Sequence, residues 1–60
     1  MLTEKEIEVL KLKSKKLTQN EIAKKLRISQ PAVSSFYNNA MNKIKKAEEI
    51  TQLKKELEIK

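Results

Sequence analysis

The sequence predicts an all-α fold of three to four helices, the last of them long. The chain of 60 residues contains no Gly and a single Pro, so little in it breaks a helix. Three helix-start signals follow one another, and apolar residues recur at spacings of three and four, as on the buried stripe of a helix. A chain of this length forms at most one small domain, near the lower limit at which a core alone supports folding.

The first predicted helix runs from about residue 4 to residue 13. Thr3 and Glu6 have the spacing of a capping box, in which the Thr hydroxyl accepts from a backbone N–H of the first turn and the Glu reaches back to the Thr N–H. The residues expected on its buried stripe are Ile7, Leu10 and Ser14, with Val9 and Leu12 beside them.

Two further helix starts lie close together, at Thr18 and Ser29. Thr18 forms a second capping box with Glu21, and Ser29 is a good N-cap with Pro31 two positions inside, where a missing N–H costs nothing. We therefore expect a helix of about two turns over residues 19–26 and another directly after Ser29. Only about three residues are left for the turn, so the two helices cross steeply, as in a helix-turn-helix.

The C-terminal half of the chain has no evident helix breaker. Neither Gly nor Pro occurs from Ala32 to Lys60, and apolar residues keep their spacing of three and four. Either one helix runs to about Glu58, or the chain bends near Asn42, the last of three clustered asparagines, into a fourth helix. We expect residues 1–46 to form the helix-turn-helix domain and residues 47–60 a C-terminal helical extension.

The composition excludes most enzyme and cofactor chemistry. The chain has no Cys, no His and no Gly, so it lacks thiolate ligands, the commonest general base and the glycines of a phosphate-binding loop. We therefore expect no enzyme activity, no metal, no cofactor and no small-molecule ligand. No apolar run has the length of a membrane span or a signal peptide, which predicts a soluble, cytoplasmic protein without a membrane partner.

The positive charge is concentrated in the middle of the chain. Residues 1–10 carry one Lys against three Glu, residues 11–46 carry nine Lys and one Arg against one Glu, and residues 47–60 carry three Lys against four Glu. The net charges are thus −2, +9 and −1, which sum to the total of +6. A basic middle between weakly acidic ends indicates a localised site for a polyanion.

Three motifs in order resemble the LuxR/FixJ-type helix-turn-helix domain, the similar fourth region of sigma factors and, most closely, the archaeal Tfx-type DNA-binding proteins. The motifs are LTEKEIEVLKL (Leu2–Leu12), LTQNEIAKKL (Leu17–Leu26) and ISQPAVSS (Ile28–Ser35). In such domains the two helices of the motif pack through small and aliphatic side chains, and the matching positions are Ile22, Ala23, Leu26, Ile28 and Val33. The turn position that is commonly Gly is Arg27 here, which requires a left-handed conformation or a different turn.

The resemblance implies that a recognition helix over about residues 30–42 enters the major groove of double-stranded DNA. Its base-contacting residues would be Gln30, Pro31, Ser34, Ser35 and Asn38. Gln and Asn pair bidentately with adenine, and the helix has no Arg for guanine, so an A·T-leaning site is expected. Phosphate contacts would come from Lys15, Lys16, Thr18, Gln19, Arg27, Lys43, Lys45 and Lys46. Tyr37 is either a core residue or a further phosphate contact through its hydroxyl.

The C-terminal extension carries an apolar stripe flanked by mixed charge. The stripe consists of Ala47, Ile50, Leu53 and Leu57. Such a pattern is typical of a dimer helix or a short coiled coil, and a single recognition helix contacts only a few base pairs. We therefore expect a homodimer; the alternative is that the stripe folds back onto the first helix and completes a single-chain core.

The leading prediction is a sequence-specific DNA-binding protein that regulates transcription as a homodimer and is associated with the nucleoid. One alternative is a protein-interaction module that docks on the transcription machinery through its basic face. Another is a nucleoid-type protein that binds DNA without sequence preference and with a steep salt dependence.

Overall fold

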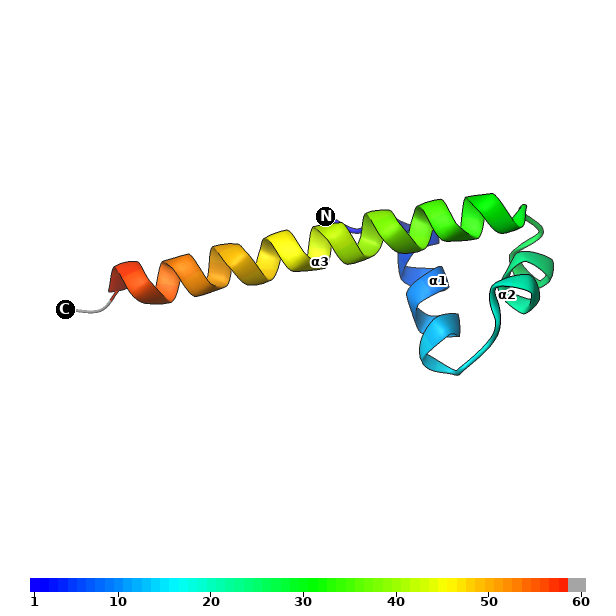
Figure 1. Cartoon of the computed structure of the whole chain (residues 1–60), viewed down its shortest axis with the longest axis horizontal. Coiled ribbons are helices and arrows are strands. Elements are labelled where there is room, and N and C mark those ends of the chain that lie inside the picture. The colour runs from blue at the N-terminus through cyan, green and yellow to red at the C-terminus, as the bar shows by residue number, and fades with distance from the viewer. Residues whose placement is uncertain (59–60) are drawn as a thin grey trace.

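The computed structural model describes residues 1–58 and contains three helices within them. They are α1 (Glu4–Ser14), α2 (Gln19–Leu26) and α3 (Gln30–Glu58). Figure 1 shows α1 and α2 on one side of the first half of α3, while the second half of α3 extends away alone. The molecule is accordingly elongated, with extents of 51 × 18 × 15 Å. The all-α prediction with a long last helix is confirmed.

Both predicted capping boxes are present. The Thr3 hydroxyl accepts from the Glu6 N–H at 3.3 Å, and Glu6 Oε1 accepts from the Thr3 N–H at 2.9 Å. At the start of α2 the corresponding distances for Thr18 and Glu21 are 3.2 and 2.8 Å. Ser29 caps α3 by accepting from the Ala32 N–H at 3.2 Å. Each cap satisfies a backbone donor of a first turn, which fixes where the helix begins.

A basic residue in the left-handed conformation follows both α1 and α2, two residues after Ser14 and directly after Leu26. Lys16 has φ 67°, and Arg27 has φ 58° and ψ 45°. In each case the next residue donates its N–H five residues back, Leu17 to the Leu12 carbonyl and Ile28 to the Ala23 carbonyl. This is the Schellman motif, and it confirms the left-handed alternative for Arg27. A side chain with a Cβ costs about 1–2 kcal/mol in this conformation, so each turn is closed at an energetic cost.

The core lies where the three helices meet. Val9, Ile22, Ala23 and Val33 are buried, each with at most 6% of its surface exposed. Six partly buried side chains pack around them: Leu12, Leu17, Leu26, Ile28, Phe36 and Tyr37. The predicted packing of α2 against α3 is therefore confirmed.

The prediction for the buried face of α1 is wrong in part. Val9 is fully buried and Glu6 is 4% exposed, whereas Ile7, expected on the buried stripe, is 38% exposed. Glu6 lies on the buried face because its carboxylate accepts from the Lys43 ammonium at 2.8 Å as well as from the Thr3 N–H. A buried carboxylate with charged and hydrogen-bonding partners is tolerated where an unpaired one is not. The spacing of apolar residues alone therefore predicted a buried stripe through Ile7 and Leu10, one residue away from the buried Glu6 and Val9.

The single long helix is the correct one of the two alternatives for the C-terminal half. α3 runs without a break through Asn42 for 29 residues, which corresponds to about 44 Å at the rise of an α-helix. Ile50, Leu53 and Leu57 are 66, 53 and 71% exposed, so within residues 1–58 the stripe does not fold back onto α1. Residues 59 and 60 of the predicted extension lie outside the described residues.

Candidate nucleic-acid interface

The outward face of α3 presents short polar side chains. Successive residues are about 100° apart around a helix, so Pro31, Ser35 and Asn38 lie on the side of α3 opposite the buried Val33 and Ala40. All three outward residues are exposed. Ser35 and Asn38 are polar and Pro31 is small and apolar, and no carboxylate occurs between residues 30 and 47. Such a surface can approach the negatively charged groove of a duplex.

The other two residues of the predicted base-contacting set lie beside this surface. Gln30 is exposed, and its side-chain amide donates to Asn20 Oδ1 at 3.1 Å. The Gln19 amide donates to the Gln30 carbonyl at 2.7 Å, so the first turns of α2 and α3 are tied together. Ser34 is half-buried at the edge facing α1. Gln30 and Ser34 thus border the outward surface, whereas Ser35 and Asn38 lie on it.

The predicted phosphate-contacting residues fall into two groups, and all of their members except the half-buried Gln19 are exposed. Lys15, Lys16 and Thr18 lie in the turn before α2, with Gln19 in its first turn. The Thr18 hydroxyl accepts from the Glu21 N–H, which leaves its O–H free to donate. The Thr18 backbone N–H donates to Glu21, and this hydrogen bond lowers the pKa of the carboxyl. The first turn of α2 therefore keeps a fixed shape, in which the capping box uses the Thr18 and Glu21 N–H groups and leaves those of Gln19 and Asn20 as donors at the start of the helix.

The second group consists of three exposed residues, Arg27, Lys45 and Lys46. Arg27 lies in the turn between α2 and α3, and the two lysines lie on α3 beyond the globular part. Lys43 belongs to neither group. Its ammonium donates to Glu6 Oε1 at 2.8 Å and to the Met1 carbonyl at 3.1 Å. The hydrogen bond from Lys43, with that from the Thr3 N–H, lowers the pKa of Glu6. Lys43 thus links α1 to α3.

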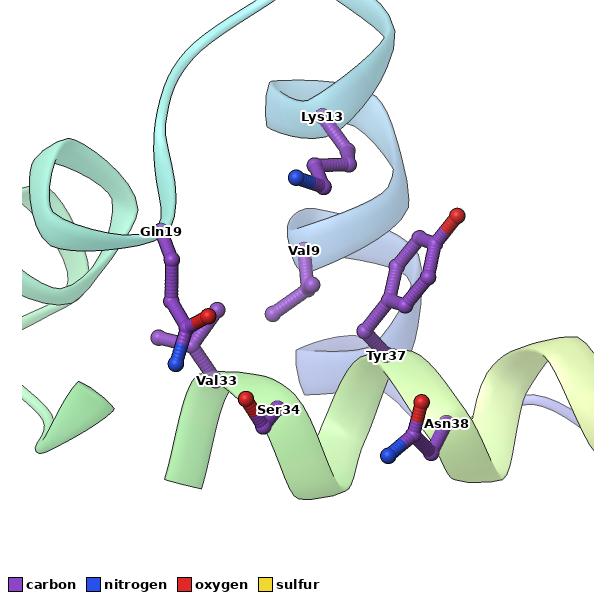
Figure 2. Close-up of a pocket in the computed structure, with 7 residues that line it drawn as sticks. All are labelled: Val9, Lys13, Gln19, Val33, Ser34, Tyr37 and Asn38. Carbon is purple, nitrogen blue, oxygen red and sulfur yellow. The ribbon is translucent and has the colours of Figure 1, made fainter. Parts of the chain in front are cut away.

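A pocket that the sequence analysis did not anticipate lies beside the outward surface. It has a volume of about 240 Å³, and its lining residues are Val9, Lys13, Gln19, Val33, Ser34, Tyr37 and Asn38 (Figure 2). The Lys13 ammonium lies 5.7 Å from the centre of the Tyr37 ring. Lys13 could not be singled out from the sequence because it is one of many lysines and its neighbour Tyr37 is 24 positions away.

No group of three His, Cys, Asp or Glu side chains within residues 1–58 could hold a metal ion. None of the three helices is both long enough and apolar enough to cross a bilayer.

The tight turn between α2 and α3, the capped helices and the polar face of α3 define a helix-turn-helix domain of the kind found in DNA-binding regulators. The family model described as bacterial regulatory proteins of the luxR family, GerE, matches residues 1–55. The chain therefore belongs to this family, which is a family of regulatory proteins and not of enzymes.

One curated relative comes from Methanocaldococcus jannaschii and is named "Putative transcriptional regulatory protein". The two sequences are 50% identical over 46 residues, which cover 77% of this chain and 34% of the relative. The chain thus spans about a third of the length of the curated relative that it matches. No solved structure matches the chain.

Proposed function

We propose that the protein binds double-stranded DNA sequence-specifically, with the outward face of α3 over residues 30–42 in the major groove, and regulates transcription. The observation that carries this proposal is the exposed surface of Ser35, Asn38 and the small apolar Pro31, opposite a buried face and free of carboxylates. The name of the Methanocaldococcus relative supports a regulatory role. A protein that reads duplex DNA acts at the nucleoid, in the cytoplasm.

The dimensions of α3 suit this role. A helix with its side chains is about 10–12 Å across, and the major groove of B-DNA is about 12 Å wide. Gln30, Ser34, Ser35 and Asn38 are the side chains proposed to reach base edges, with Pro31 against a thymine methyl. Because Gln and Asn suit adenine and no Arg is present in this stretch, we propose a preference for A·T-rich half-sites.

The phosphate contacts would come from both sides of the groove. On one side are the turn before α2 and the first residue of that helix, with Lys15, Lys16, Thr18 and Gln19. On the other side are Arg27, Lys45 and Lys46. Lys16 and Arg27 support this assignment in a specific way. Both occupy left-handed positions that Gly would fill more favourably. A basic side chain at each position is therefore expected to have a role other than closing the turn.

We further propose a homodimer through the C-terminal part of α3. Ile50, Leu53 and Leu57 lie within about 60° of arc on one side of the helix, and each is more than half exposed. Ala47 borders them. Apolar side chains in such a row are expected to be covered, and a second copy doubles the number of base pairs read.

The test is a selection from a randomised duplex pool at two salt concentrations, with binding of the recovered duplexes followed by fluorescence anisotropy. Enrichment of a two-fold-symmetric A·T-rich site is the expected result. The Ser35→Glu variant should lose this binding, while the matched Gln52→Glu variant, with the same charge change on the exposed tail of α3, should keep it.

Two results would overturn the proposal in different ways. Tight binding at low salt with no enrichment and no effect of Ser35→Glu would identify a nonspecific DNA binder. Absence of DNA binding at both salt concentrations would leave docking on a protein of the transcription machinery as the function of the basic face.

A further inference from the structure

We propose that the pocket between the three helices holds one phosphate of the DNA backbone, and that Lys13 is the residue that binds it. This inference rests on the proposed function, since it assigns a contact within the same DNA interface. It adds a cation from α1, a helix for which no DNA contact was predicted from the sequence.

The pocket combines an apolar base with polar side chains from all three helices. Val9 and Val33 are fully or almost fully buried and close its inner side. Lys13 from α1, Gln19 from α2 and Ser34 from α3 contribute an ammonium, an amide and a hydroxyl around it (Figure 2). One N–H of the Gln19 amide already donates to the Gln30 carbonyl, which leaves the second as a donor. A phosphate oxygen accepts hydrogen bonds from donors of each of these kinds.

Lys13 is held over this pocket and is not engaged by a carboxylate. The ion pairs found among residues 1–58 are Lys5 with Glu8 and Lys43 with Glu6, so Lys13 takes part in neither. Its ammonium instead lies 5.7 Å from the centre of the Tyr37 ring, within the range of a cation–π interaction. Figure 2 shows the Tyr37 hydroxyl pointing away from Gln19 and Ser34. Tyr37 therefore acts as a positioning residue through its ring, and not as a phosphate ligand through its hydroxyl.

The location of the pocket matches the path of the DNA backbone. Ser34 and Asn38 line the pocket, and Asn38 also belongs to the outward surface of α3. A helix that fills the major groove has the two phosphate backbones along its two flanks. When the outward surface lies in the groove, one DNA backbone runs along the side of α3 that faces α1 and the start of α2. A phosphate of that backbone then lies against Lys13. The cation on Lys13 neutralises that phosphate, and counterions are released.

The experiment measures the salt dependence of binding to the duplex recovered by the wild-type protein. Each neutralised phosphate contributes about 0.9 to the slope of log K against log salt. Lys13→Gln should reduce the slope by about 0.9, so that from 50 to 200 mM salt the wild-type affinity falls about 3.5-fold more than that of the variant. The recovered sequence should not change. Lys11→Gln, with the same charge change in the same helical turn, should keep the wild-type slope because it lies about 200° away around α1.

Two further measurements separate the roles of the residues. Tyr37→Phe retains the aromatic ring and should keep the wild-type slope, whereas a reduced slope would assign the contact to the hydroxyl and overturn the positioning role. Lys13→Gln should unfold cooperatively and only a few degrees below the wild type, because it loses the cation–π interaction with Tyr37 and no core contact; this rules out a folding defect as the cause. An unchanged slope for Lys13→Gln, or an equal loss for Lys11→Gln, overturns the phosphate assignment while the proposed function stands. Failure of the wild-type protein to select any duplex overturns the proposed function, and this inference with it.

Discussion

Replacing Arg27 by Gly should make the protein more stable although it removes a charged side chain. Arg27 has φ 58° and ψ 45°, and a residue with a Cβ pays about 1–2 kcal/mol in this region. Gly avoids this cost but loses about 0.4–1 kcal/mol through the greater freedom of the unfolded chain. The two ranges together allow a net gain in free energy of unfolding of about 0–1.6 kcal/mol, and their middle values give about 0.5–1 kcal/mol.

The assay is urea denaturation followed by circular dichroism, with thermal unfolding as a second measurement. For a chain of this size, a gain of 0.5–1 kcal/mol raises the midpoint by roughly 2–8 °C. Lys24→Gly is the matched control, since Lys24 is exposed within α2 and carries the same charge. It should lose about 1 kcal/mol, the usual cost of Gly inside a helix. If Arg27→Gly loses as much stability as Lys24→Gly, the account of this turn is wrong.

Three further predictions concern the core, the buried ion pair and the tail. Ile22→Ala should cost about 2–5 kcal/mol in urea denaturation, because Ile22 is fully buried, and a loss below about 1 kcal/mol would contradict the packing described. Glu6 has a lowered pKa in the folded protein, so its stabilisation is present above the unfolded-state pKa and is lost as the pH falls through the folded value. Melting curves from pH 7 to pH 2 should therefore show a fall in acid that is smaller in Glu6→Gln, and equal falls would refute the role of the pair with Lys43. Leu53→Glu should give a monomer in analytical ultracentrifugation under conditions in which the wild type is a dimer, and a monomeric wild type at all concentrations would reject the proposed dimer.

Local signals in the sequence were sufficient to predict the helix starts. The Thr18–Glu21 capping box and the Ser29 cap, which accepts from the Ala32 N–H, act within one turn of chain, so their hydrogen bonds can be foreseen from spacing alone. The left-handed Arg27 was predicted as one of two options because the resemblance places Arg27 at a turn position that is commonly Gly. The steep crossing of α2 and α3 follows from the same turn.

Features that depend on contacts between distant residues could not be predicted. Glu6 lies on the buried face of α1 because Lys43, 37 positions away, neutralises it, and an apolar pattern cannot reveal such a partner. The pocket beside α3 likewise depends on Lys13 and Tyr37 meeting across two helices. The absence of a bend near Asn42 shows that three asparagines, each a modest cost in a helix, do not end it without a capping or packing reason.

The most direct test of the central claim is to map where the outward face of α3 lies on DNA. The chain has no Cys, so Ser35→Cys provides a unique thiol to which an iron chelate that cleaves DNA can be attached. The account predicts cuts at a few positions inside the recovered site, repeated in the second half-site, and diffuse or absent cuts from the same chelate on Gln52→Cys. Equal and diffuse cutting from both positions would contradict the claim that α3 reads the major groove.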